Sequence, residues 1–173
     1  MEGCMSSMMG NDPIQLCEGL KQLKEEHPPL LDMLKGLLEL STDIEQEQSP
    51  AVFAELITKV KSFINVLDPH SQREEGVLFR MMEQYLGKGT GPIAVMEYEH
   101  DQAKSFIGSF LENAKQAEQM KEAEMIVNAG LIKNAYYTLV EHFAKEEKIL
   151  FPMAENMLSD EEKLDLLKRI NGI

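Results

Sequence analysis

Apolar residues recur every three to four positions along most of the chain, which is the spacing of an amphipathic α-helix. In the segment 51–85, one such face is formed by Phe53, Leu56, Ile57, Val60, Phe63, Ile64 and Leu67. An earlier stretch leads toward Ile44 with the same spacing and contains Leu30, Leu31, Leu34, Leu37 and Leu38. No segment alternates between apolar and polar residues as a half-buried strand does. The pattern predicts an all-α protein.

Proline, glycine and capping residues divide this pattern into separate elements. Asp12-Pro13 and Ser49-Pro50 each place a capping side chain before a proline at the first helical position. The predicted helices span about 13–25, 28–44, 51–85, 92–118 and 121–158, and the glycine-rich loop 87–91 separates the third from the fourth. Because His27 precedes a proline, we expect it to lie at the kink between the first two, outside α geometry.

The end of the chain carries a further helix signal. Ser159-x-x-Glu162 is the pattern of a capping box, and Gly172 lies just past the end of the short helix that it opens. Pro152 is expected to bend the last part of the helix before it. Short connections between long helices favour an up-down-up-down four-helix bundle over residues 12–173, with short extra helices at both termini. Residues 1–11, rich in Gly, Ser and Met, are expected to form a flexible tail.

Composition excludes some classes of partner. The formal net charge is -13, which argues against binding to a phosphate backbone, since such partners need clustered Lys and Arg. The two cysteines, Cys4 and Cys17, give neither a disulfide framework nor a zinc-binding spacing. The N-terminus lacks a signal-peptide pattern and no apolar run reaches membrane-spanning length, so we expect a cytoplasmic location.

The candidate chemistry lies in a motif that occurs twice in the chain, once from His70 and again from His142. The first copy is His70-Ser-Gln-Arg-Glu74-Glu75-Gly-Val-Leu78-Phe79, and the second is His142-Phe-Ala-Lys-Glu146-Glu147-Lys-Ile-Leu150-Phe151. The other two histidines of the chain, His27 and His100, precede the two copies at nearly the same period. All four histidines thus belong to one repeating pattern.

The positions of these histidines relative to the predicted turns give an independent check. His27 precedes a chain reversal at Ser49 by about six helical turns, and His70 follows it by about six. His100 and His142 lie at similar distances before and after a reversal near Met120. Since each helical turn advances the chain by about 5.4 Å, each pair sits at one height in an antiparallel hairpin. The sequence therefore predicts four histidines at one level of the bundle.

Each motif also places a carboxylate beside its histidine. Residues i and i+4 share a helix face, so Glu74 lies beside His70 and Glu146 beside His142. The same faces carry apolar residues that point them toward the core, namely Leu67, Leu78, Leu139 and Ile149. Two facing carboxylates are suited to bridging two cations while histidines terminate each of them. Imidazole and carboxylate without thiolate suit iron, with manganese or zinc as substitutes.

Two further features bear on this prediction. Glu75 and Glu147 are expected to face outward or to hydrogen-bond a ligand. The ferritin-like di-iron class uses paired Glu-x-x-His motifs, and Glu97-x-x-His100 fits once. The other histidines have Lys24, Leu67 and Leu139 at the corresponding place, so the chain lacks the second copy that this class requires.

These residues resemble the hemerythrin-like (HHE cation-binding) family over about residues 25–158. The resemblance implies a four-helix bundle with an oxygen-bridged di-iron centre. Its bridging carboxylates would be Glu74 and Glu146, and its terminal ligands would be His27, His70, His100 and His142.

The chain departs from two branches of that family. Oxygen-carrying hemerythrins have a second histidine one turn before the third-helix ligand, where this chain has Met96, and their last bridging aspartate lies five positions after its histidine. The pattern looks more like the bacterial proteins that repair iron centres. Those carry an extra histidine on the first helix, and here an acidic residue of the segment 43–48, such as Glu45 or Glu47, or solvent, is expected to replace it. Their N-terminal paired-cysteine segment is not evident.

Three functions are compatible with such a site. The first is binding or sensing of O2, NO or peroxide, because six protein ligands shared between two metals leave open positions. The second is an enzyme or repair factor that reduces NO or peroxide, or releases iron to a damaged cluster. The third is an inert structural or storage site.

Overall fold

The computed structural model describes residues 14–173, and every regular element in that range is a helix. In chain order these are α1 (Glu18–Glu25), α2 (His27–Gln46), α3 (Pro50–Arg73), a π-helical turn (Glu74–Leu78), α4 (Phe79–Leu86), α5 (Gly91–Ala114), a 3-10 turn (Ala117–Gln119), α6 (Glu122–Lys145), a second π-helical turn (Glu146–Leu150), α7 (Phe151–Met157) and α8 (Asp160–Ile170). The all-α prediction is confirmed. The tail predicted at 1–11 lies outside the described residues.

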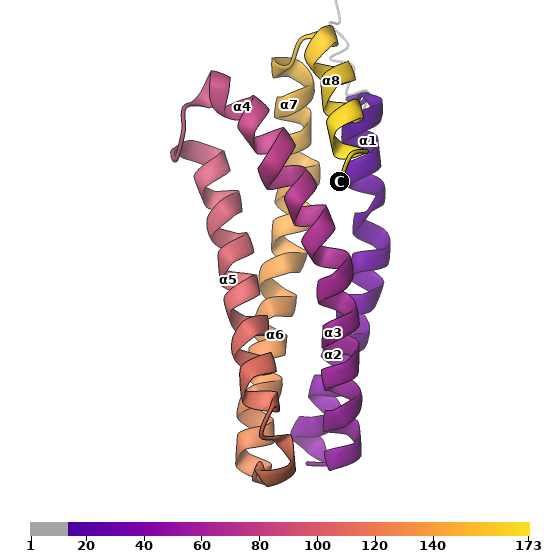
Figure 1. The fold of residues 1–173 in the computed structure, drawn as a ribbon, viewed down its shortest axis with the longest axis vertical. Coiled ribbons are helices and arrows are strands. Elements are labelled where there is room, and N and C mark those ends of the chain that lie inside the picture. Colours follow the sequence, from indigo (N-terminus) through magenta and orange to yellow (C-terminus); the bar gives the residue numbers. More distant parts are fainter. Residues whose placement is uncertain (1–13) are drawn as a thin grey trace, which may run out of the picture.

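The helices between residues 18 and 157 form four long rods. The rods run alternately up and down (Figure 1). The first rod is α1 with α2, the second α3 with α4, the third α5, and the fourth α6 with α7. Helix α2 packs against α3 and α6, and α5 packs against α6. The short α8 turns back and packs against α1 and the first π-helical turn. The predicted four-helix bundle with short helices at both ends is confirmed. Within residues 14–173, no helix has the length and apolar character that crossing a bilayer requires.

The start of the first helix differs from the prediction. The proposed cap at Asp12-Pro13 lies outside the described residues, but residues 14–17 are not helical and α1 begins at Glu18. Cys17 has an extended backbone, and its N–H donates a hydrogen bond of 2.6 Å to a carboxylate oxygen of Glu155. This contact with a distant part of the chain holds the segment out of the helix, which local sequence signals do not reveal.

The break between the first two helices lies one residue earlier than predicted. Glu26 connects α1 to α2, and His27 is the first residue of α2, so the expectation that His27 leaves α geometry is wrong. Pro28 and Pro29 follow within the first turn of α2, where the missing N–H groups have no intrahelical partner to lose. The break therefore accommodates both prolines without loss and leaves His27 facing the core.

Each long helix that carries a motif copy is interrupted by a π-helical turn at the motif's first glutamate. The N–H of Phe79 donates to the carbonyl of Glu74, and the N–H of Phe151 donates to the carbonyl of Glu146. Pro152 follows the second turn, but Arg80 occupies the matching place after the first, so the proline that we expected to bend the helix is not required for the interruption.

The structure corrects one residue of the predicted core face. Leu67, Leu78 and Leu139 are buried as expected, whereas Ile149 is 55% exposed. Its counterpart in the first motif copy, Val77, is buried, and α8 packs against the first π-helical turn. Leu150 is buried, as is its counterpart Leu78.

The buried apolar residues of the described range 14–173 form two clusters. One lies among α2, α3, α5 and α6 and includes Phe53, Phe63 and Phe110. The other lies where α1, α4, α7 and α8 meet and includes Phe79 and Phe151. The buried histidines and glutamates belong to neither cluster, and His27 contacts one aromatic residue of each, Phe143 and Phe151. A polar layer therefore crosses the bundle between two apolar regions.

Candidate metal centre

Six buried polar residues form this layer, and each helical rod supplies at least one of them. They are His27, His70, Glu74, His100, His142 and Glu146, and none is more than 1% exposed. The near-equal distances of the histidines from the turns of the bundle place them at one level, as the sequence predicted. The two glutamates are the first residues of the π-helical turns.

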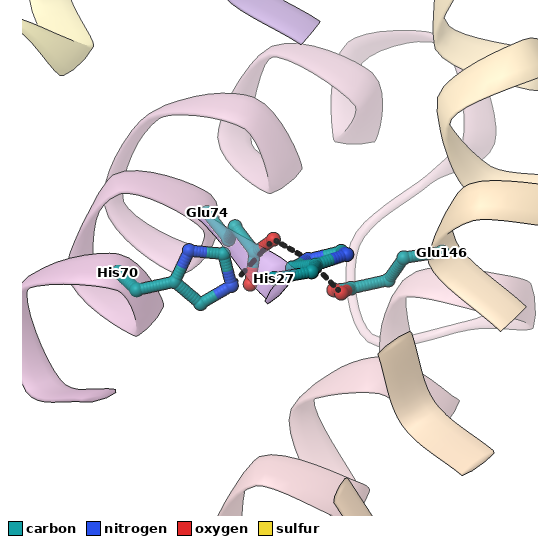
Figure 2. Close-up of side chains that lie close together, drawn as sticks. All are labelled: His27, His70, Glu74 and Glu146. Atoms are coloured by element: carbon teal, nitrogen blue, oxygen red, sulfur yellow. Dashed lines mark ion pairs between the residues drawn. The ribbon is translucent and has the colours of Figure 1, made fainter. Parts of the chain in front are cut away.

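The six side chains divide into two overlapping groups that share both glutamates. The first half-site contains His27 and His70 with Glu74 and Glu146, and its ligand atoms all lie within 4.8 Å of one another (Figure 2). The second half-site contains His100 and His142 with the same two glutamates, within the same limit. The Nε2 atoms of His70 and His142 lie 3.2 and 3.0 Å from the carboxylates of Glu74 and Glu146 on their own helices.

Contacts between helices complete each half-site. His27 Nε2 lies 3.3 Å from an oxygen of Glu146 and 3.9 Å from an oxygen of Glu74. His100 Nε2 lies 3.5 Å from the other oxygen of Glu74. Each glutamate thus has one oxygen near each half-site, which is the arrangement that a bridging carboxylate requires.

The atoms that face one another in this layer have no hydrogen-bond partner among the described residues. They are the Nε2 atoms of all four histidines and both carboxylate oxygens of Glu74 and Glu146. Burying unpartnered polar atoms is costly, and so many in one place indicate a missing partner rather than a packing defect. Nitrogen and carboxylate oxygen donors converge without a thiolate, so the set fits two cations such as iron.

The outward nitrogen of every histidine is held by a second carboxylate. Each Nδ1 lies within hydrogen-bonding distance of one glutamate: His27 with Glu147 at 2.9 Å, His70 with Glu26 at 2.7 Å, His100 with Glu75 at 2.6 Å and His142 with Glu99 at 3.0 Å. A carboxylate at Nδ1 fixes the proton on that nitrogen and leaves the Nε2 lone pair directed into the core. All four histidines therefore present the same nitrogen to the centre.

These four glutamates, which we call the outer carboxylates, connect the bundle in chain order. Each lies on one helical rod and holds the histidine of the next rod, and Glu147 on the fourth rod holds His27 on the first. A cation lies beside each: Arg73 with Glu26 at 3.0 Å, Lys104 with Glu75 at 3.7 Å, Lys145 with Glu99, and Lys24 with Glu147 at 3.8 Å. The outer charges thus nearly cancel, and the charge of Glu74 and Glu146 remains for bound cations.

The carboxylates alter the proton affinity of the histidines. Burial alone lowers the pKa of His27, but the nearby carboxylates of Glu146 and Glu74 outweigh it and raise the pKa to about 9. Nearby carboxylates likewise outweigh the effect of burial at the other two positions, raising the pKa of His70 to about 10 and that of His142 to about 9. Conversely, the surrounding histidines overcome the burial of Glu74 and hold its pKa well below the usual range. Without metal, protons take the place of cations in this layer.

Sequence patterns locate only part of this arrangement. Glu75 and Glu147 are expected from the sequence to hydrogen-bond a ligand or face outward, and both contact a histidine Nδ1. Glu26 and Glu99 have no predicted role, although each directly precedes a histidine, because their partners lie on other helices.

The expected acidic replacement for the extra first-helix histidine is wrong. Glu45 lies near the far end of α2 from His27, which is about 27 Å along the helix axis. Its carboxylate accepts a hydrogen bond of 2.7 Å from the Lys133 ammonium group. Glu47, at the end of the same helix, is equally remote, so neither residue reaches the centre.

Comparison with known proteins connects this centre to a family. The family model described as "Hemerythrin HHE cation binding domain" matches residues 18–154. The chain is similar to the iron-sulfur cluster repair protein YtfE of Salmonella typhimurium, with 31% identity over 128 residues, which cover 71% of this chain and 58% of that relative. The protein of the same name from Salmonella schwarzengrund is 30% identical over the same shares. The matched region is thus little more than half the length of these relatives.

Proposed function

Since the chain belongs to the hemerythrin HHE cation-binding family, we propose that it holds two non-haem iron ions in the core of its bundle and binds O2, NO or peroxide there. The observation that carries this proposal is the convergence of buried, unpartnered ligand atoms from six side chains. Family membership implies a bound cation, and the donor set favours iron over metals that prefer thiolates. Manganese and zinc are possible substitutes.

The roles of the six residues follow from the shared position of the two glutamates. Glu74 and Glu146 belong to both half-sites and would hold both ions. His27 and His70 would terminate one ion, and His100 and His142 the other. The iron pair would supply the capacity to bind such small molecules and to exchange electrons with them.

The protein's own part in this function is to prepare the site. The outer carboxylates fix the proton on each Nδ1 and so keep all four Nε2 atoms available as ligands. The phenyl rings of Phe79, Phe143 and Phe151 pack against His100 or His27 and limit rotation of the imidazoles. Six protein ligands shared between two ions leave coordination positions open to a small molecule.

A role in repair, or in reduction of NO or peroxide, is the second candidate. It is supported by the relatives at 30–31% identity, whose name is iron-sulfur cluster repair protein. The two candidates differ in turnover. A binding or sensing protein responds to O2 or NO without consuming a reductant, whereas a reducing enzyme consumes one. A repair factor restores activity to an enzyme whose iron-sulfur cluster has been damaged, and this assay separates it from both.

Elemental analysis of protein produced in iron-replete medium tests the proposal first. We expect about two irons per chain and a visible absorption band that changes on exposure to NO or azide. Zero or one iron per chain after reconstitution would refute the dinuclear site. Two irons without any response to O2, NO or peroxide would refute the binding function and favour a structural or storage site.

A further inference from the structure

The internal repeat gives almost every residue around one half-site a counterpart around the other. Positions on α3 correspond to those on α6 as His70 does to His142, and positions on α2 correspond to those on α5 as His27 does to His100. One aromatic contact is retained on both sides, since the ring of Phe151 stacks 5.7 Å from His27 and that of Phe79 stacks 6.0 Å from His100. The two half-sites can therefore be compared position by position.

Among the buried positions within one helical turn of the histidines, two differ clearly in size between the half-sites. Phe143 stacks on His27 with 4.5 Å between ring centroids, and its counterpart is Ser71. Leu30 follows His27 by one turn, and its counterpart after His100 is Ala103. All four side chains are buried. The second half-site thus has two small residues where the first has a phenyl ring and an isobutyl group.

The hydroxyl of Ser71 is itself unusual. It is fully buried and has no hydrogen-bond partner among the described residues. Among the described residues, every other buried side-chain nitrogen or oxygen atom without a hydrogen-bond partner belongs to the six candidate ligands. Ser41 is also fully buried, but its hydroxyl has a partner within its own helix. It donates a hydrogen bond of 2.8 Å to the carbonyl of Leu37. A buried hydroxyl without a partner indicates a bound molecule that the protein atoms do not supply.

The helix geometry places this hydroxyl beside the second half-site. Glu75 follows Ser71 by one helical turn, and its carboxylate reaches His100 Nδ1 at 2.6 Å. Residues four apart share a helix face, so Ser71 lies on the side of its helix that faces α5, the helix of His100. It is also adjacent in sequence to His70, at the level of the polar layer.

We propose that Ser71 donates a hydrogen bond to a small ligand bound at the second half-site, which makes that half-site the reactive one. This inference rests on the proposed di-iron function. The ligand class is a small molecule with an exposed acceptor atom, such as O2, NO, peroxide or azide. At the matching position of the first half-site, Phe143 stacks on His27 and offers no hydrogen-bond donor. Ser71 is thus a binding residue for the ligand and not a ligand of the metal.

Azide binding to the iron-loaded full chain tests this role. We expect Ser71→Ala to weaken azide binding by about 3–10-fold, the loss of one hydrogen bond, when the titration is followed by visible absorption. Ser71→Thr, which keeps the hydroxyl, should bind azide within about twofold of the unaltered chain. Ser41→Ala is the matched control, since it removes a buried hydroxyl that already has a partner, and it should leave azide affinity unchanged.

A second measurement does not depend on iron. In the metal-free chain, Ser71→Ala removes an unsatisfied buried hydroxyl, so its unfolding temperature should rise by about 2–6 °C. Ser41→Ala should lower it, because that change breaks a hydrogen bond. A fall in the unfolding temperature of Ser71→Ala would show that the hydroxyl has a protein partner and would overturn the proposal.

The outcomes separate this inference from the proposed function. If the unaltered chain lacks two irons or fails to bind azide, the di-iron function itself is refuted. If it binds azide and Ser71→Ala binds azide equally well, only the role of Ser71 is refuted. If Ser71→Ala loses iron, Ser71 supports the metal rather than the ligand, and the proposal is again overturned.

Discussion

The two half-sites are alike in what holds the centre and unlike in what surrounds it. Each has two histidines, shares Glu74 and Glu146, and fixes every Nδ1 with a glutamate that is paired with a cation. Around this common framework, Phe143 and Leu30 border one half-site, and Ser71 and Ala103 border the other. The comparison teaches that the repeated framework carries the candidate cation ligands, whereas in the proposed function selectivity for a small ligand would depend on the residues that the repeat did not keep.

The order of the outer carboxylates explains why the framework needs four helices. Glu26 and Glu99 each directly precede a histidine in the sequence. Glu75 and Glu147 each directly follow one of the two central glutamates, Glu74 and Glu146. In both cases the histidine that they hold lies on the next helical rod. The orientation of every imidazole therefore depends on the packing of its neighbour, so assembly of the bundle and formation of the site are coupled.

The largest loss of iron is expected when one of the two glutamates that both half-sites share is removed. Glu74→Ala or Glu146→Ala takes a bridging candidate from both half-sites at once, so each variant should fall from about two irons per chain to fewer than about 0.5. Elemental analysis after dialysis measures this. Glu141→Ala, an exposed neighbour of His142, is the matched control and should retain both irons. Two tightly held irons in either core variant would contradict the bridging role.

Removing one histidine should damage the half-site to which it belongs more than the other half-site. His70→Ala takes a terminal ligand from the first half-site and His142→Ala from the second, so each variant should lose at least one iron and unfold at a lower temperature. We expect the two variants to lose iron and thermal stability to a similar extent. Iron content and unfolding temperature, measured for both variants under the same conditions, test this. Retention of two tightly bound irons by both variants would show that these histidines are not ligands.

Much of the framework was predictable because it depends on helix periodicity alone. The fourth-residue spacing of each His-x-x-x-Glu motif and the equal distances from the turns bring together all six candidate ligands. The π-helical turns were not predictable, since they depend on backbone hydrogen bonds within the packed bundle. The exposure of Ile149 was not predictable either, since its counterpart in the first motif copy, Val77, is buried. The partners of Glu26 and Glu99 lie on other helices, far away in the sequence, where no local pattern links them.

A smaller effect is expected from the outer carboxylates. Glu75→Gln alters the second half-site and Glu147→Gln the first, and in both variants the amide oxygen can still accept the Nδ1 proton. Both should therefore keep about two irons, with metal affinity reduced by about 10–100-fold, as for other partners of metal-bound histidines. Competition with a chelator measures the affinity of each variant. Loss of an iron from Glu75→Gln would show that this carboxylate is itself a metal ligand.

The smallest effect concerns the metal-free chain, in which protons replace cations. Folding raises the pKa of His27 and His142 to about 9 and that of His70 to about 10, above the unfolded value of about 6.5. A raised pKa stabilises the folded state fully below pH 6.5, and this contribution is lost as pH rises through 9 to 10. The unfolding temperature should therefore fall by on the order of 5–10 °C between about pH 6.5 and 9.5.

Iron loading should abolish this fall in unfolding temperature, and the comparison therefore distinguishes the histidine layer from general alkaline denaturation. Bound cations require unprotonated Nε2 atoms, so metal binding releases the protons and becomes stronger as pH rises from 6.5. The iron-loaded chain should then show no fall in unfolding temperature over the interval in which the metal-free chain loses stability. His70→Ala sharpens the test, because it removes the histidine whose pKa rises to about 10 and should flatten the decline in the metal-free chain. An equal decline with and without iron would show that the buried histidines do not exchange protons for metal.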